Sequence, residues 1–245
     1  MKYYEMHDNV YKKLHKKNII GWNGEKDVKD IFFSDINTAI KEELSRFFPI
    51  SKEKNVLDLG TGTGNSALFM AKEGFNVTGY DLSPKAIELA IENAKKLDLK
   101  VDFCVKNIAE SDFIKNYDLV IDSSFLHCIV YNSERKHIFN SIKKVLKNDA
   151  YLFIHTMIQS DDMSEILSRD SFILKDDVLW SKAYDDCDMD MLTIDGKKVF
   201  PHRRILSLEN FEKEILEHGF IIKHKKILEN ERIPKTYIAW LQLKS

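Results

Sequence analysis

Short apolar runs alternate with amphipathic stretches through the middle of the chain. Each run is short enough for a buried strand, and most are followed by apolar residues at helical spacing. Strand and helix repeated in this order predict crossover units on a parallel sheet that helices cover on both faces. The predicted strands are 55–59, 76–80, 101–105, 119–121 and 151–154.

A helical pattern precedes the sheet. Apolar residues from Val28 to Phe47 recur at helical spacing, which predicts one long helix that ends before Pro49. Later helices are indicated by their first residues, since serine is a favoured N-cap and proline fits the first helical turn. Three helices are predicted to follow such a cap, at Ser83 with Pro84, at Ser133 and at Ser207.

Residues 158–206 break this rhythm. The dipeptide Asp195–Gly196 lies between two apolar runs and predicts a hairpin. The region is too short to bury a core of its own, so we expect an insertion over the sheet. It also contains an acidic stretch, which is a solvated loop, an attraction for a cationic amine substrate or a metal-binding cluster, with the solvated loop favoured: Asp185, Asp186, Asp188 and Asp190.

Composition removes several classes of protein. The chain has 245 residues, a formal net charge of −2 and 44% hydrophobic residues, which excludes disordered, collagen-like and disulfide-scaffold proteins. The near-neutral charge argues against a general nucleic-acid binder. No apolar run is long enough for a membrane span, and the three cysteines form no Cys-x-x-Cys pair and no metal-site spacing, so we expect a cytoplasmic protein without a metal.

The strongest motif is a strand that runs into a glycine turn, Val56-Leu57-Asp58-Leu59-Gly60-Thr61-Gly62-Thr63-Gly64-Asn65. Such a turn exposes backbone N–H groups at the start of a helix and lets a ligand approach the main chain closely. The spacing is Gly-x-Gly-x-Gly, where a dinucleotide site prefers Gly-x-Gly-x-x-Gly. Because Asp58 would repel a pyrophosphate and attract an ammonium group, we expect a ligand with an amino group here.

A second acidic residue ends the next predicted strand. Asp81 lies 23 residues after Asp58, the distance that one crossover unit requires, and can accept hydrogen bonds from both hydroxyls of a ribose. A sugar and an amino acid in one ligand indicate S-adenosylmethionine. Asn107 and Ile108 follow the third strand, where they can meet adenine, and residues 122–127 end the fourth strand beside the expected methyl group.

These motifs resemble the class I S-adenosylmethionine-dependent methyltransferases, in particular the small-molecule branch that contains thiopurine and tellurite-resistance enzymes. The resemblance implies a doubly wound, Rossmann-like sheet of seven mostly parallel strands with an antiparallel last strand, which fits two closing strands at 220–227 and 236–243. Two positions depart from the family: Asn107 stands where Asp is more usual, and residues 145–150 replace a Pro-Gly-Gly turn. The cofactor residues that the resemblance implies are Asp58, Gly60, Thr61, Gly62, Gly64, Asp81, Leu82, Asn107, Ile108 and Ser123.

Residues for the acceptor are less sharply indicated. His127 and Asp122 are the candidates for a base or a positioning group at the methyl-transfer site, although a histidine at a helix start is often only structural. Trp22, between two glycines, is a candidate lid. Tyr131 and Arg203 are further candidates for the acceptor pocket, Arg203 because its fork binds carboxylates.

We therefore predict a single methyltransferase domain over 1–245, a monomer or homodimer, that transfers methyl from S-adenosylmethionine to N, S or O of a small molecule, cationic or not, and releases S-adenosylhomocysteine. Its parts are a helical cap (1–53), a cofactor-binding half (54–157), a substrate-cap insertion after the fifth strand (158–206) and a closing helix with two strands (207–245). The alternatives are an RNA, protein or peptide methyltransferase, a non-catalytic cofactor-binding subunit and an NAD-dependent oxidoreductase. No Asn-Pro-Pro-Tyr motif, Pro-Cys pair or basic extension supports a nucleic-acid substrate.

Overall fold

The computed structural model describes residues 2–49, 51, 53–111, 116–169, 171–183, 191–229 and 234–244. Its larger sheet has seven strands in the order β10-β11-β5-β4-β1-β2-β3. β11 is antiparallel to both of its neighbours, and the pairs from β5 to β3 are parallel. The strands are β1 (Asn55–Leu59), β2 (Asn76–Asp81), β3 (Asp102–Val105), β4 (Tyr117–Ser123), β5 (Leu146–Ile158), β10 (Phe220–Leu228) and β11 (Lys235–Leu243). The predicted sheet of seven strands with an antiparallel last strand is confirmed.

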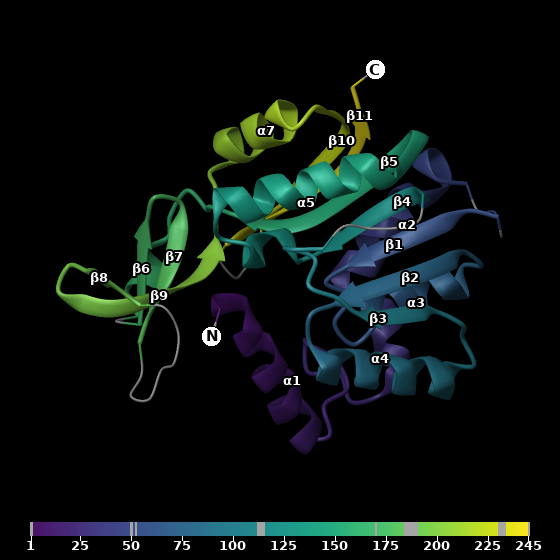
Figure 1. The fold of residues 1–245 in the computed structure, drawn as a ribbon, viewed down its shortest axis with the longest axis horizontal. Helices are drawn as coiled ribbons and strands as arrows, with labels where there is room; N and C mark the ends of the chain where they lie inside the picture. The colour runs from purple at the N-terminus through teal and green to yellow at the C-terminus, as the bar shows by residue number, and fades with distance from the viewer. Residues whose placement is uncertain are drawn as a thin grey trace.

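Helices cover both faces of this sheet (Figure 1). α5 (Asn132–Val145) and α7 (Leu208–Glu217) pack on one face, in the core that contains Leu57 and Val120. α2 (Asp35–Phe47) and α3 (Asn65–Lys72) pack on the other, in the core that contains Val56 and Trp240. α4 (Pro84–Leu97) packs beside α3 near the β3 edge. Because successive strand residues point to opposite faces, each central strand supplies both cores.

Two sequence predictions about helices are wrong in detail. The expected long helix is divided into a 3-10 helix η2 (Val28–Phe33) and α2, because Ser34 adopts an extended conformation and its hydroxyl caps the N–H of Asn37 at 3.3 Å. α5 begins at Asn132, so its N-cap is Tyr131 rather than Ser133. The capping serines Ser83 and Ser207 hold their predicted positions.

Residues after β5 form a second sheet in the order β6-β7-β9-β8, which projects beyond one end of the larger sheet (Figure 1). Asp195 and Gly196 make the two-residue turn of the predicted hairpin, with φ of 48° and 75°. The four aspartates of the acidic stretch lie outside the described residues. The elements are α6 (Ser164–Leu167), β6 (Phe172–Lys175), β7 (Val178–Lys182), β8 (Leu192–Ile194) and β9 (Lys197–Arg204).

The N-terminal segment lies in the space between the small sheet and α4 (Figure 1). It consists of a 3-10 turn, η1 (Tyr3–Glu5), and α1 (Met6–Lys16). α1 packs against α4, and η1 packs against β9. Within the described part of the chain, no helix is both long enough and apolar enough to cross a bilayer.

Candidate active site

A cavity of about 360 Å³ lies at the carboxyl ends of β1 to β4, as expected for a ligand site in an open α/β sheet. The loops after these strands form one wall, and α1 with the following loop and β9 forms the other. Eight of the ten predicted cofactor residues line it: Gly60, Thr61, Gly62, Asp81, Leu82, Asn107, Ile108 and Ser123. Trp22, His127 and Arg203 also line it, whereas Asp58, Gly64, Asp122 and Tyr131 do not.

The glycine turn has the backbone conformation that its sequence requires. Gly60, Gly62 and Gly64 have φ of 63°, 55° and 89°, which residues with side chains rarely adopt. A Cβ on Gly60 would lie 2.7 Å from Cβ of Phe125, and one on Gly62 would lie 2.6 Å from the hydroxyl of Tyr11. Glycine is therefore needed both for the turn and for close packing around it.

Asp58 lies behind the turn and not on the cavity wall. Strand alternation turns it toward α3, where its Oδ2 accepts hydrogen bonds from Thr61 Oγ1 at 2.6 Å and from the N–H of Ala67 at 3.2 Å. Burial raises its pKa to about 6, and its buried Oδ1 has no hydrogen-bond partner among the described residues. The structure therefore makes Asp58 a support of the loop, whose charge would gain from a cation placed near it.

Asp81 stands at the end of β2 and joins the two halves of the cofactor wall. Its Oδ2 accepts a hydrogen bond from the N–H of Gly62, and its Oδ1 accepts one from the N–H of Ser83, both at 2.8 Å. Burial raises its pKa. These two N–H groups fix the carboxylate in place while each oxygen keeps a lone pair for a hydroxyl of a ligand.

Asn107 is engaged within its own turn. Its Nδ2 donates to Glu110 Oε2 at 2.9 Å and to the Tyr4 hydroxyl at 3.4 Å, and its Oδ1 accepts from the N–H of Ala109 at 3.2 Å. Ile108 beside it is buried on the cavity wall. The amide thus shapes this end of the cavity, and Ile108 offers the apolar surface.

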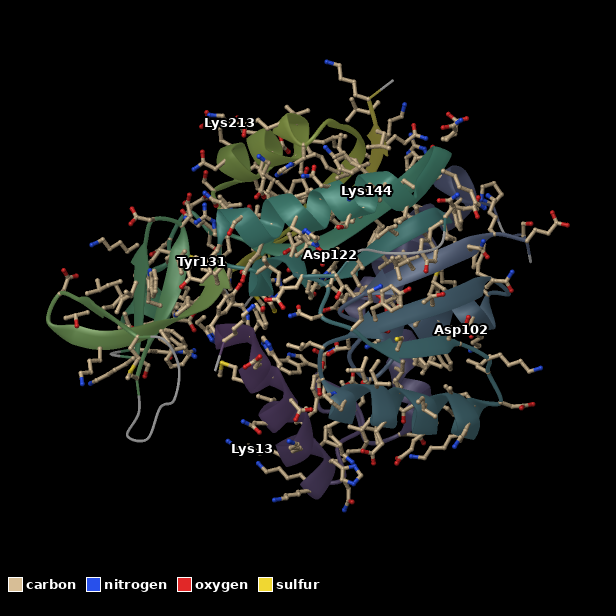
Figure 2. The ribbon with its side chains drawn as sticks, viewed as in Figure 1. Lys13, Asp102, Asp122, Tyr131, Lys144 and Lys213 are labelled. Carbon is tan, nitrogen blue, oxygen red and sulfur yellow. The ribbon has the colours of Figure 1, made fainter. Side chains whose placement is uncertain are left out.

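Asp122 supports the turn after β4, near the centre of the molecule in Figure 2. Its Oδ1 accepts hydrogen bonds from the N–H groups of Phe125 at 2.7 Å and Leu126 at 2.9 Å, and burial raises its pKa to about 7. Because it does not line the cavity, it can only position the residues that follow, among them His127.

His127 is buried and lies on the cavity wall. The N–H of Met157 donates to its Nδ1 at 3.4 Å, and the hydroxyl of Thr156 lies 3.2 Å from the same atom. Burial lowers the pKa of His127, so the ring is neutral at pH 7. Since Nδ1 accepts a hydrogen bond, the ring proton belongs on Nε2, which leaves His127 a donor for a partner such as the Cys128 sulfur or a ligand.

α1 closes the cavity above the glycine turn. Asp8 holds it there, because its Oδ1 accepts hydrogen bonds from the Ser83 hydroxyl at 2.6 Å and from the N–H of Lys85 at 3.2 Å, at the start of α4. The rings of His7 and Tyr11 pack against Trp22, at 5.8 and 5.4 Å between centroids. Trp22, although 44% exposed, thus belongs to the roof of the cavity.

The remaining sequence candidates differ in whether they reach the cavity. Arg203 reaches the cavity from β9, whereas Tyr131 is 43% exposed and packs against Tyr3, toward the small sheet (Figure 2). Sequence reasoning missed Tyr4, His7 and Tyr11, although their spacing of three and four residues indicates one helical face. The described residues contain no cluster of three His, Cys, Asp or Glu side chains that could hold a metal ion.

Comparison with known sequences agrees with this geometry. A family model described as a methyltransferase domain matches residues 50–218. A putative methyltransferase of Geobacillus sp. (strain WCH70) is 34% identical over 111 residues, 44% of this chain and 45% of that protein. EEF1A lysine methyltransferase 2 of Danio rerio is 28% identical, over 52% of this chain and 58% of that protein. The probable S-adenosyl-L-methionine-dependent methyltransferase TehB of Haemophilus influenzae is 26% identical, over 55% and 47%. The chain thus spans about half the length of these relatives.

The fold is also found among solved structures. A S-adenosylmethionine-dependent methyltransferase from Clostridium acetobutylicum superposes with a TM-score of 0.63 at 18% identity, over 97% of this chain and 100% of that one. At this identity the likeness concerns the fold, and it extends through the N-terminal segment and the small sheet.

Proposed function

The chain belongs to the S-adenosylmethionine-dependent methyltransferases, and we propose that it transfers the methyl group of this cofactor to a small-molecule acceptor. One observation carries the proposal: Asp81 and the glycine turn are joined by the Gly62 N–H at one end of a cavity that α1 roofs. A roofed cavity of about 360 Å³ suits a small acceptor better than a folded macromolecule.

The residues present fit S-adenosylmethionine. The backbone cradle at Gly60 and Gly62 has no room for a side chain, and the orphan Oδ1 of Asp58 lies behind it. Asp81 would accept hydrogen bonds from the ribose, Leu82 and Ile108 would pack beside adenine, and the glycine turn would hold the methionine part. When bound, the cofactor supplies a methyl group that its positively charged sulfur has already activated.

The protein's own contribution is then binding, orientation and exclusion of water. The acceptor would offer its lone pair to the activated methyl carbon, and a proton that it still carries after transfer would leave with the methylated product. Because His127 is neutral and carries its proton on Nε2, we propose that it donates a hydrogen bond to the acceptor and does not remove a proton from it. This favours an acceptor atom that is nucleophilic without a base from the protein.

Calorimetry tests the cofactor and the site together. S-adenosylmethionine and S-adenosylhomocysteine should bind, and NAD should not. In Asp81→Ala the affinity for S-adenosylhomocysteine should fall about tenfold or more, because hydrogen bonds to a charged group are lost. Asp81→Asn keeps one acceptor oxygen, so its affinity for S-adenosylhomocysteine should lie between those of the wild type and Asp81→Ala. Binding of NAD without either sulfur ligand would overturn the proposal, and unchanged affinity in Asp81→Ala would remove that residue from the ribose role.

A protein acceptor is the second candidate, since the zebrafish relative is named as a lysine methyltransferase. The two candidates separate when the protein is incubated with methyl-labelled cofactor and a cell extract divided by size. A labelled compound other than the cofactor is expected in the small-molecule fraction, and transferred label confined to the protein fraction would overturn a small acceptor.

A further inference from the structure

Arg203 brings a positive charge to the cavity from outside the cofactor-binding half. It lies near the end of β9, opposite Leu179 of β7, and its side chain lines the cavity together with Tyr11, His127 and Cys128. These neighbours belong to α1 and to the turn after β4. Arg203 therefore stands on the wall where an acceptor would lie, and it belongs to the part of the chain that the cofactor motif does not use.

No acidic side chain of the described residues forms an ion pair with this guanidinium. Its Nη1 donates to the backbone carbonyl of the adjacent His202 at 2.8 Å. Arg135 offers the contrast, since its Nε and Nη2 both donate to the carboxylate of Glu214 at 2.6 Å. A partly buried guanidinium without a carboxylate partner loses hydration that an anion would replace.

The imidazoles around Arg203 do not neutralise its charge, whereas its neighbour Cys128 responds to it: burial raises the pKa of this thiol, but the charge of Arg203 and the contact with His127 bring it below its usual value. Burial lowers the pKa of His7 to about 4 and of His202 to about 3, and it lowers that of His127, so these imidazoles are uncharged at pH 7. Two acidic wall residues are engaged elsewhere: Asp8 binds the start of α4, and Asp81 binds the Gly62 and Ser83 N–H groups.

One further cation lines the cavity, but its surroundings differ. The ammonium group of Lys106 lies 4.9 Å from the centre of the Tyr80 ring, in the loop after β3. That loop also carries Asn107 and Ile108, at the end assigned to adenine. The acceptor end thus has Arg203 as its cation among the described residues.

We infer that the acceptor carries a carboxylate and that the guanidinium of Arg203 binds it. The inference rests on the proposed function of this cavity. A planar guanidinium fork matches a carboxylate, and one positive charge among neutral imidazoles balances one negative charge rather than two. The sequence-based expectation of a cationic acceptor rested on Asp185, Asp186, Asp188 and Asp190, which lie outside the described residues.

Arg203 anchors the acceptor and does not act on the reacting atom. A carboxylate held by the fork has its lone pairs engaged by N–H donors, so it is a poor nucleophile. The methyl group is received by another atom of the same molecule, on the side of His127.

The test measures binding of simple probes to the protein saturated with S-adenosylhomocysteine. The probes are 3-phenylpropionate, 3-phenylpropionamide and 3-phenylpropylamine, which differ in charge and little in shape. The carboxylate should bind about tenfold or more tightly than the amide, and Arg203→Gln should remove that preference. Arg203→Lys, which keeps the charge and loses the fork, should retain part of it.

The matched control is Lys198→Gln, which removes one positive charge from the same strand at an exposed position. This variant should keep the preference for the carboxylate over the amide. The affinity for S-adenosylhomocysteine is measured for each variant and should stay at the wild-type value, which separates this inference from the proposed function. Equal binding of the carboxylate and the amide, tighter binding of the amine, absence of saturable carboxylate binding, or an unchanged preference in folded Arg203→Gln would each overturn the role of Arg203. Loss of cofactor binding in the wild type would instead overturn the proposed function.

Discussion

Gly62 is the residue at which the cofactor wall and its roof meet. Its φ is 55°, and a Cβ added there would lie only 2.6 Å from the Tyr11 hydroxyl, so Gly62→Ala both strains the turn and displaces α1. We expect affinity for S-adenosylhomocysteine to fall about tenfold or more, as measured by calorimetry. Tyr11→Phe in the same protein removes the hydroxyl and should restore part of the loss.

Gly74→Ala provides the matched control. Gly74 also has a positive φ, 98°, but a Cβ there meets no atom within 4 Å. The variant should lose stability by about 1 kcal/mol through strain alone and bind the cofactor normally. Equal loss of affinity in both glycine variants would show that strain, and not the contact with Tyr11, decides the effect.

At the residue scale, the sequence predicts which residues belong to the site better than it predicts which way their side chains point. The motif indicated Asp58 and Asp81 together, because carboxylates at adjacent strand ends suggest one ligand. Only Asp81 reaches the cavity, since the register of β1 turns Asp58 toward the N–H of Ala67. When both faces of a strand are buried, the sequence of five residues does not indicate which face its acidic residue points to.

Among the elements, α1 depends on a contact with the first turn of α4. Asp8→Ala removes the acceptor for the Ser83 hydroxyl and for the N–H of Lys85, so it should loosen α1 from the cavity. We expect faster proteolysis within α1 and a change in Trp22 fluorescence, with affinity for S-adenosylhomocysteine reduced severalfold.

Asp8→Asn keeps an acceptor oxygen and should preserve most of the docking. Fluorescence from Trp22 is isolated by Trp22→Phe, since Trp180 and Trp240 are buried elsewhere. A proteolysis rate for Asp8→Ala equal to that of the wild type would contradict the role of this contact.

The sequence predicts helices and strands correctly where the local pattern agrees with the tertiary packing. β1 and the serine caps of α4 and α7 follow from their residues alone. The break at Ser34 was missed because the apolar spacing continues across it. Ser34 ends η2 and at the same time caps the start of α2 with its hydroxyl. The placement of α1 over the cavity depends on partners more than 70 residues away, such as Ser83, and no local pattern reports these.

For the whole molecule, buried titratable groups set two opposing dependences of stability on pH. Burial lowers the pKa of His155 to about 4, so unfolding lets it take a proton below pH 6.5 and stability is lost as pH falls toward 4. Burial raises the pKa of Asp122 to about 7, so the folded protein takes that proton first. This contribution is present at low pH and is lost as pH rises through 7.

Asp122→Asn separates the two effects. The amide oxygen can still accept from Phe125 and Leu126, but the carboxyl no longer gains a proton on acidification. Between pH 7 and pH 5 the variant should lose about 2 kcal/mol more of its free energy of unfolding than the wild type. Denaturant unfolding at pH 5, 6, 7 and 8 measures this, and parallel curves for the two proteins would contradict the protonation of Asp122.

The packing of Tyr3 has a practical consequence for how the protein is produced. Its hydroxyl accepts from the N–H of Val130 at 2.8 Å and donates to Glu134 at 2.5 Å, so the first described turn is fixed against the start of α5. Any affinity tag joined before it emerges beside the small sheet and the cavity roof, whereas the other end of the chain leaves beyond β11, on the far side of the molecule (Figure 1). Assays of acceptor turnover should therefore use a carboxy-terminal tag.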